Sequence, residues 1–248
     1  MPLRSVNDIR GYVLDAQDGE FGKCSDFLFD DEHWAIRYIV ADTSKWLPGR
    51  KVLISPISIG EADGITRRLA VGLTKDQIKG APPLDSDAPV SRQYEIAFNR
   101  YHDWGHYWGG TAVWGPHPYP RLLNRPEADP ALPPVKTEEP RLRSTKEVKG
   151  YHIQATDRDI GHVEDFIVDS DTWVIRYLVI DTSNWLPASK KVLTAPSWVD
   201  LVDWRRNKVL VDLTSDTIKN SPEYDPSLPV NREYEMRLYD FYGRPYDW

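Results

Sequence analysis

The sequence predicts a mostly β protein made of two tandem small β-barrels, each with a short helix, joined by a proline-rich linker. Three observations lead to this prediction. The chain of 248 residues contains two copies of one pattern, each copy holds several short segments of period two, and eight of the 20 prolines separate the copies. The expected domains are a first barrel repeat over residues 1–104, an aromatic and proline-rich linker over 105–144, and a second barrel repeat over 145–248.

The internal repeat is visible over most of each half. The offset between the copies is 139 and becomes 140 after one extra residue near Ser189. A repeat of this length and order indicates duplication of one domain. The first copy begins GYVLDAQDGEFGKCSDFLFDDEHWAIRYIVADTSKWLPGRKVLISP, and the second begins GYHIQATDRDIGHVEDFIVDSDTWVIRYLVIDTSNWLPASKKVLTAP.

Each copy is predicted to be mostly strand. The segments 34–41 and 173–180 alternate with period two, are rich in β-branched and aromatic residues, and are apolar on both faces, which is typical of a central strand. The strand at 26–29 is expected to join the first of them through a four-residue hairpin loop at 30–33. Further strands are expected at 51–54 and 68–73, and because a unit of this size gains by having no free edges, a closed barrel is favoured.

One short helix and one extended linker complete the expected organisation. Thr74 is a suitable N-cap, Asp76 lies in the first turn and Gly80 closes the segment, so a helix is predicted over 74–80. The prolines of residues 116–140 exclude a helix or a central strand there, because proline lacks an N–H donor. A semi-rigid spacer is therefore expected between the barrels.

Several short motifs recur along the repeats. The first copy carries the motifs Asp18-Gly19-x-x-Gly22, Asp26-Phe27, Trp34-x-Ile36-Arg37-Tyr38, Asp42-Thr43-Ser44, Trp46-Leu47-Pro48 and Lys51-Val52-Leu53. The second copy departs from the pattern at Arg158, where the first has Gly19. Together these motifs resemble the PRC-barrel domain family, across most of both repeats. The resemblance implies barrels of about six strands that bind other macromolecules, as in the cytoplasmic part of the photosynthetic reaction-centre H subunit and the C-terminal domain of a ribosome-maturation factor.

Composition excludes several classes of function. A formal net charge of −7 disfavours a broad nucleic-acid-binding surface, which needs clustered positive charge. The sequence holds no apolar run long enough to span a bilayer and no signal-peptide pattern, so a cytoplasmic protein is expected. Cys24 is the single cysteine, which excludes an intramolecular disulfide and a cysteine-built zinc site.

Two arginines in the middle of apolar strands need partners, because an unpaired buried charge is costly. Arg37 and Arg176 are expected to form structural ion pairs, with Asp26 and Asp165 on the preceding strand as the expected partners and Asp42 and Asp181 at the strand ends as alternatives. An anion-binding arginine is the functional alternative.

Aromatic residues supply the candidate binding surface. Trp104, Trp108 and Trp114 cluster after the first barrel, and Trp46 and Trp185 recur just after the central strand of each copy. Aromatic side chains carry much of the energy of protein interfaces. The alternatives are that the tails fold back over their own barrels and that the Trp-Leu-Pro loops fold onto the barrel ends.

The polar motifs are interpreted as turns and solvated loops, and no catalytic residue, metal ligand or cofactor is predicted. The expected function is a non-catalytic binding or assembly module for a protein partner or for self-association. The alternatives are a hydrolase-type enzyme with carboxylates in an inter-barrel cleft, and a ribosome- or photosynthetic-complex-associated factor by family analogy.

Overall fold

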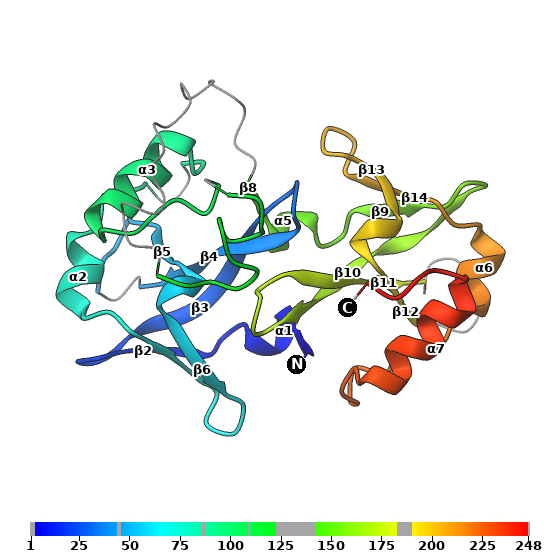
Figure 1. Cartoon of the computed structure of the whole chain (residues 1–248), viewed down its shortest axis with the longest axis horizontal. Helices are drawn as coiled ribbons and strands as arrows, with labels where there is room; N and C mark the ends of the chain where they lie inside the picture. Colours follow the sequence, from blue (N-terminus) through cyan, green and yellow to red (C-terminus); the bar gives the residue numbers. More distant parts are fainter. Residues whose placement is uncertain are drawn as a thin grey trace. The chain divides into compact units, whose positions relative to one another are not determined.

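The computed structural model shows two β-rich units, each with a seven-stranded sheet and short helices (Figure 1). It describes residues 3–43, 46–85, 88–108, 110–122, 142–182 and 190–247. The predicted two-domain, mostly β architecture is confirmed.

Neither unit is a contiguous stretch of chain. The first-repeat unit comprises the described residues of Ile9–Ser144 together with Asp171–Trp173. The second-repeat unit comprises the described residues of Met1–Asp8, Thr145–Ser170 and Val174–Trp248. Simple boundaries at 104 and 145 therefore do not describe the units, because each one includes residues that belong to the other repeat.

The sheet of the first-repeat unit has the order β5-β4-β3-β2-β7-β6, with β8 as an additional partner of β3. Neighbouring strands are antiparallel except for the parallel pair β2 and β7. The elements are β2 (Val13–Ala16), β3 (Gly19–Asp30), β4 (Ala35–Asp42), β5 (Val52–Ile54), η1 (Pro56–Ser58), β6 (Ile59–Asp63), β7 (Arg68–Val71), α2 (Lys75–Gly80), α3 (Arg92–Tyr101) and β8 (Leu142–Ser144).

The second-repeat unit has the same architecture, with the order β12-β11-β10-β9-β14-β13 and β1 as an additional partner of β10. Its parallel pair is β9 and β14. The elements are β1 (Leu3–Ser5), α1 (Val6–Ile9, which ends in the first-repeat unit), α5 (Thr145–Val148), β9 (His152–Gln154), β10 (Asp159–Asp169), β11 (Ile175–Asp181), β12 (Lys191–Thr194), η2 (Pro196–Trp198), β13 (Val199–Asp203), β14 (Lys208–Val211), α6 (Ser215–Asn220) and α7 (Arg232–Tyr242).

Each sheet is curled, because its first and last strands are consecutive in the chain. In a flat sheet, β5 and β6 would lie about 24 Å apart, at about 4.8 Å per strand interval. The five steps of chain from Ile54 to Ile59 reach at most about 18 Å, and they include the compact turn η1. Among the described residues no hydrogen-bonded pairing joins β5 to β6. The prediction of a closed barrel is thus corrected to a curled sheet whose edge strands are joined through a turn.

The two repeats exchange their first strands. β3 is 12 residues long, and one of its edges is shared by two strands: Gly19–Lys23 pair with β2, and Leu28–Asp30 pair with β8. β10 pairs in the same way with β9 and β1. Without these lent strands, the second half of each long strand would leave backbone N–H and C=O groups without sheet partners.

The lent strands are identical in sequence and are held in the same way. Both read Leu-Arg-Ser. The hydroxyl of Ser144 donates a hydrogen bond to the carboxylate of Asp26, and the hydroxyl of Ser5 donates to that of Asp165. Both aspartates are buried, with at most 9% of the residue exposed. This arrangement gives each aspartate a polar partner inside the unit that it helps to complete.

The predicted short helix forms in both units, and a second, longer helix was not predicted. α2 has Thr74 as its N-cap with a complete capping box, and α6 has Thr214. The longer helices α3 and α7 begin at the caps Ser91 and Asn231. Each packs an aromatic residue on its own unit: Phe98 of α3 meets Tyr38 edge-on, and Tyr239 of α7 meets Trp198.

Candidate functional site

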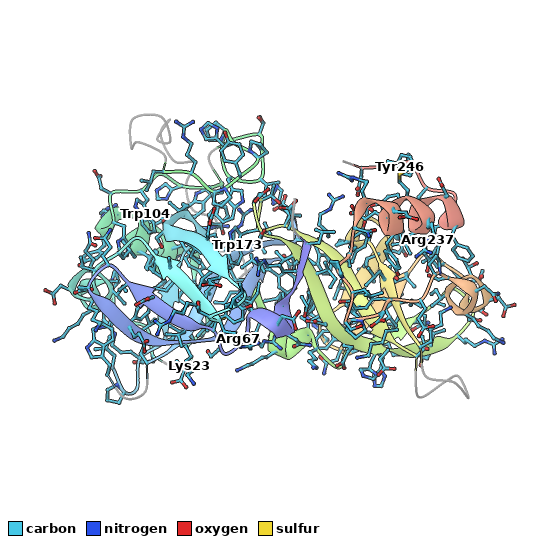
Figure 2. The ribbon with its side chains drawn as sticks, turned by 90° about the horizontal axis from the view of Figure 1, so that it is seen from below. Lys23, Arg67, Trp104, Trp173, Arg237 and Tyr246 are labelled. Carbon is cyan, nitrogen blue, oxygen red and sulfur yellow. The ribbon has the colours of Figure 1, made fainter. Side chains whose placement is uncertain are left out.

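The aromatic segment that follows α3 is folded against its own unit. Trp104 is 7% exposed and Trp114 is 2% exposed, whereas Trp108 is half-buried. The indole N–H of Trp114 donates to the backbone oxygen of Thr172 at 2.7 Å, and Trp173 is buried against Phe27 in the same unit (Figure 2). Trp114 is therefore a core residue and not a binding surface, and residues 105–122 belong to the unit rather than to a spacer. Residues 123–141 of the expected linker lie outside the described residues.

Arg37 is the centre of this aromatic cluster. Its side chain is 1% exposed, and its Nε donates to Asp30 at 2.5 Å, while a terminal nitrogen donates to the backbone oxygen of Val113 at 2.7 Å. The guanidinium lies 3.9 Å from the ring centroid of Tyr107 and 4.7 Å from that of Trp114. The expected pairing of Arg37 with Asp26 is corrected: the partner is Asp30, at the end of the same strand.

Arg176 has a different environment from its counterpart. Its guanidinium pairs with Asp247 at the C-terminal end of the described chain, and the two side chains are 20% and 41% exposed. The expected partner Asp165 is instead bound by Ser5 and by the backbone N–H of Asn7, the latter at 3.1 Å. The repeat thus preserves the arginine but not its partner: among the described residues, Arg37 is buried by the segment that holds Tyr107 and Trp114, whereas Arg176 pairs with Asp247.

A buried carboxylate fixes each long helix to its sheet. Glu95 on α3 accepts hydrogen bonds from Tyr107 at 2.8 Å and Tyr38 at 3.3 Å, and Arg92 lies 2.9 Å away. Glu235 on α7 accepts from Tyr177 at 2.8 Å. Burial raises the pKa of Glu95, against the opposing effect of Arg92. This anchor places the C-terminal end of α3 beside the sheet edge formed by β6 and β7.

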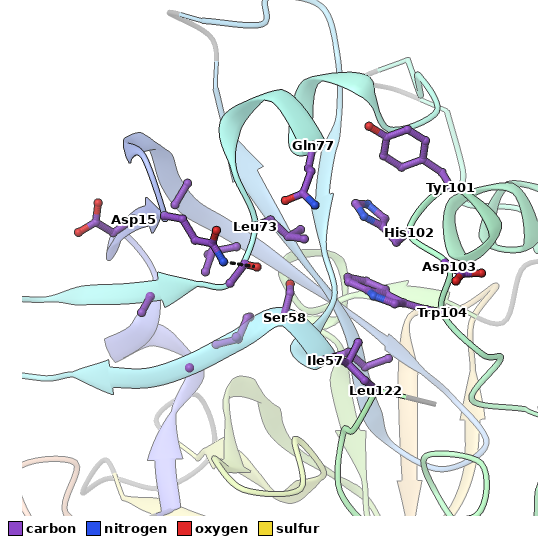
Figure 3. Close-up of a pocket in the computed structure, with 17 residues that line it drawn as sticks. Asp15, Ile57, Ser58, Leu73, Gln77, Tyr101, His102, Asp103, Trp104 and Leu122 are labelled. Carbon is purple, nitrogen blue, oxygen red and sulfur yellow. Dashed lines mark hydrogen bonds between the residues drawn. The ribbon is translucent and has the colours of Figure 1, made fainter. Parts of the chain in front are cut away.

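A pocket of about 980 Å³ lies where the end of α3 meets η1, β6 and β7 (Figure 3). The residues that line it from the sheet and from η1 include the small residues Ser58, Gly60 and Gly72 beside larger apolar ones such as Ile57 and Val71. On the other side stand His102 and Trp104, whose rings are stacked with centroids 4.5 Å apart. Gln17, whose side chain donates to the Gly72 oxygen at 3.0 Å, and Gln77 add amide groups. The pocket therefore combines an aromatic wall, an opposite side of small and aliphatic residues and a few polar groups, which is typical of ligand sites.

The charges around the pocket are negative or neutral. The residues lining it include the carboxylates Asp15 and Asp103 and hold no lysine or arginine. Asp15 pairs with Arg68 at 3.1 Å. Burial lowers the pKa of His102 to about 4, so its imidazole is neutral at pH 7.

Ser58, His102 and Asp103 share this pocket, but they do not form a catalytic triad. The Ser58 hydroxyl donates to the backbone oxygen of Ser55 at 2.9 Å. The ring of His102 is stacked on Trp104 and meets Phe98 edge-on, with centroids 4.7 Å apart. A nucleophile needs a base within hydrogen-bond reach, and no hydrogen bond joins Ser58 to His102 in the described part of the chain.

Trp46 lines a separate pocket of about 490 Å³ beside the first residues of β3. Its indole is half-buried and packs edge-on against Phe21, with ring centroids 6.4 Å apart. Lys23, Lys75 and Asp42 share the lining, so this pocket carries both signs of charge. Trp185, the counterpart of Trp46, lies outside the described residues.

One group among the described residues has atoms placed to bind a cation. His162, Glu164 and Asp181 bring potential ligand atoms within 4.8 Å of one another. Lys149 and Lys191 lie 3.5 and 3.9 Å from Glu164, and their ammonium groups compete with a cation for that carboxylate. The first repeat has Lys23, Ser25 and Asp42 at the equivalent positions. We therefore assign no metal to this group.

Comparison with known proteins supports the resemblance seen in the motifs. Residues 142–218, which include most of the second repeat, match the family model of the PRC-barrel domain. The first repeat has the same strand order, turns and helices. A search of curated proteins found no match to the chain. In the part of the chain that the structure describes, every helix is too short or too polar to cross a bilayer.

The pocket residues were missed by sequence reasoning, although a signal was present. The alignment of the repeats places Ser58 opposite Trp198, Gly60 opposite Asp200 and Gly72 opposite Asp212. At each of these three positions the first copy has the smaller residue, which is compatible with more open space in that copy. That these positions surround one space follows only from the curl of the sheet.

Proposed function

We propose that this protein is a non-catalytic binding module and that the pocket of the first-repeat unit is its docking site for a polypeptide partner. The observation that carries the proposal is the pocket itself, about 980 Å³ in volume and walled by His102 and Trp104. A PRC-barrel domain is compatible with such a role. A cytoplasmic location and the capacity for self-association are parts of the same proposal.

The engagement of the buried polar groups supports a non-catalytic role over the hydrolase alternative. The buried carboxylates of Asp26, Asp30 and Glu95 accept hydrogen bonds from side chains of their own unit. Acid–base catalysis needs carboxylates that can reach a substrate and exchange protons with it. Groups that are already bonded inside the core serve folding.

Nuclear magnetic resonance of the full chain tests the docking site. The probes are N-acetyl amides of leucine, phenylalanine and tryptophan, added to ¹⁵N-labelled protein. We expect at least one probe to cause saturable shifts at the amides of Gly60 and Gly72. The proposal is contradicted if none of the probes shifts these amides, or if the shifts map only to other parts of the chain.

An activity assay tests the non-catalytic part of the proposal. We expect no turnover of p-nitrophenyl acetate above the level of a His102→Gln variant. Turnover that is lost in this variant, with the fold intact by circular dichroism, would instead assign an enzyme to the same pocket.

A further inference from the structure

A row of three aromatic rings forms one side of the pocket in the first-repeat unit. Tyr101, His102 and Trp104 follow one another down that side (Figure 3). The ring centroids of Tyr101 and His102 lie 4.8 Å apart, and those of His102 and Trp104 lie 4.5 Å apart. Tyr101 is 44% exposed although its ring is large and mostly apolar. The row therefore presents an extended aromatic surface and not a socket for a single side chain.

Two uncharged donors in the lining have no acceptor among the described residues. The side-chain oxygen of Gln77 accepts the backbone N–H of Thr74 at 2.9 Å in the capping box of α2, but its NH₂ group donates to no described residue. The indole N–H of Trp104 likewise has no acceptor within the described chain, whereas that of Trp114 donates to Thr172. An occupant that brings uncharged acceptor oxygens would satisfy both donors.

The position of the pocket disfavours the addition of a partner strand to the sheet. The neighbouring strands β2, β7 and β6 all contribute lining residues, so the pocket runs across the sheet instead of following one edge. Strand addition would need a row of unpaired backbone groups along an edge. At the pocket, the N–H of Gly72 already donates to the oxygen of Ser58 at 2.7 Å. The groups offered to an occupant are therefore side chains: aromatic rings and amide or indole donors.

Resting on the proposed docking function, we propose that the pocket binds a proline-rich segment of the partner polypeptide in the polyproline II conformation. Such a segment has no internal hydrogen bonds, so its carbonyl oxygens can accept from Gln77 and Trp104. Proline has no N–H, so the segment adds no backbone donor that the pocket would have to satisfy. Its rings pack on aromatic surfaces, as polyproline II segments do in aromatic-lined grooves. A helical partner fits less well, because its carbonyl oxygens are bonded within the helix.

The test is a titration of the full ¹⁵N-labelled chain with two capped peptides, acetyl-hexaproline-amide and acetyl-hexaalanine-amide. Both peptides offer the same number of carbonyl oxygens, but only hexaproline has rings and a fixed φ that holds it in polyproline II. We expect saturable shifts at the amides of Gly60 and Gly72. Hexaproline is expected to bind about 10-fold or more tightly than hexaalanine, because it adds ring contacts and loses less conformational freedom on binding.

Two variants test the donors. Gln77→Glu keeps an oxygen that can accept the N–H of Thr74 in the capping box and removes the NH₂ donor. Trp104→Phe keeps an aromatic ring and removes the indole N–H. Each variant is expected to weaken the binding of hexaproline about 3- to 10-fold, as the loss of one hydrogen bond predicts.

Each of these variants has a matched control. Gln93→Glu makes the same change of charge at an exposed position of α3 outside the pocket lining. Trp46→Phe makes the same change of ring in the separate pocket beside β3. Both controls are expected to leave the affinity for hexaproline unchanged. Circular dichroism and urea denaturation show whether all the variants are folded.

The outcomes separate the inference from the proposed function. Hexaalanine binding as tightly as hexaproline, or unchanged hexaproline affinity in both Gln77→Glu and Trp104→Phe, overturns the inference and leaves the docking function standing. The same holds if hexaproline causes no shifts at Gly60 and Gly72 while the N-acetyl amides of single residues do. Absence of shifts with every peptide and every amide overturns both.

A further variant tests whether the chain supplies the occupant itself, because residues 123–141 follow the lining residue Leu122 and are rich in proline. In this variant, alanine replaces Pro126, Pro130, Pro133 and Pro134. Without added peptide, we expect the amides of Gly60 and Gly72 to keep their positions in the spectrum. Shifts of these amides would overturn the assignment to a separate partner, because a segment of this chain would then occupy the pocket.

Discussion

The exchanged strands give the sharpest test of this structure, because a change in one repeat must weaken the unit built on the other. Ser5→Ala removes the hydroxyl that donates to the carboxylate of Asp165, which is 7% exposed. A hydrogen bond to a charged group contributes about 1.5–3 kcal/mol. Because each 1.4 kcal/mol is a factor of ten, the local opening of β1 from β10 is expected to become about 10- to 100-fold more frequent.

Hydrogen exchange measured by mass spectrometry reads this opening locally. Ser5→Ala is expected to accelerate exchange at 167–169, the residues of β10 that pair with β1, and to leave 28–30 unchanged. Ser144→Ala is the matched control and should do the reverse, with acceleration at Leu28–Asp30, which pair with β8. If Ser5→Ala instead accelerates exchange at Leu28–Asp30, each repeat pairs with its own first strand and the exchange is refuted.

Three further predictions concern the cores of the units and the pocket. Arg37→Ala leaves the carboxylate of Asp30 buried without its guanidinium partner and should lower the free energy of unfolding by about 3–5 kcal/mol. Arg176→Ala removes a partly exposed ion pair and should lower it by about 1 kcal/mol or less. Equal losses in urea denaturation would contradict the assigned partners. Gly22→Ala would place a Cβ 2.4 Å from the Asp42 backbone oxygen and should lower the free energy of unfolding by about 1–3 kcal/mol. In the same assay, Gly60→Ala, whose Cβ has its nearest neighbour at 3.6 Å, should change stability by less than about 0.5 kcal/mol. A neutral Gly22→Ala would show that β3 and the end of β4 are less close than described. The pKa of His102 falls from an ordinary 6.5 to about 4 on folding, so the unfolded chain binds a proton first as the pH drops, and stability is lost from about pH 6.5 toward pH 4. In parallel urea titrations, His102→Gln should lose less stability over that range. An unchanged pH dependence would show that His102 is not buried as described.

Much of the fold could be predicted because its signals are local. Period-two alternation marked β4 and β11, and the capping residues Thr74 and Thr214 marked α2 and α6. The longer helices α3 and α7 were not predicted, although Ser91 is an N-cap and Tyr94 and Phe98 lie one turn apart. The first hairpin loop is also shifted by one residue, because Trp34 adopts a left-handed φ of 54° before β4 begins.

The site was less predictable than the fold, because its residues come together only through the curl of the sheet. Ser58 and His102 are 44 positions apart, and neither is unusual in its local context. The position of Arg37 predicted a buried ion pair, but the candidates were Asp26 and the strand-end Asp42, whereas the observed partner Asp30 had been assigned to the hairpin loop.

By itself, the sequence determined that one β-rich pattern occurs twice and that each copy holds the same strands, turn and capped helix, since these depend on the spacing of neighbouring residues. It left open which copy's first strand completes which sheet, because Leu3–Ser5 and Leu142–Ser144 have the same three residues and backbone hydrogen bonds do not distinguish between them. Only the tertiary structure decided that pairing, through the path of the chain from each strand to the edge where it lies. The same holds for the pocket, since the absence of a large side chain becomes a cavity only where the surrounding elements leave its volume unfilled.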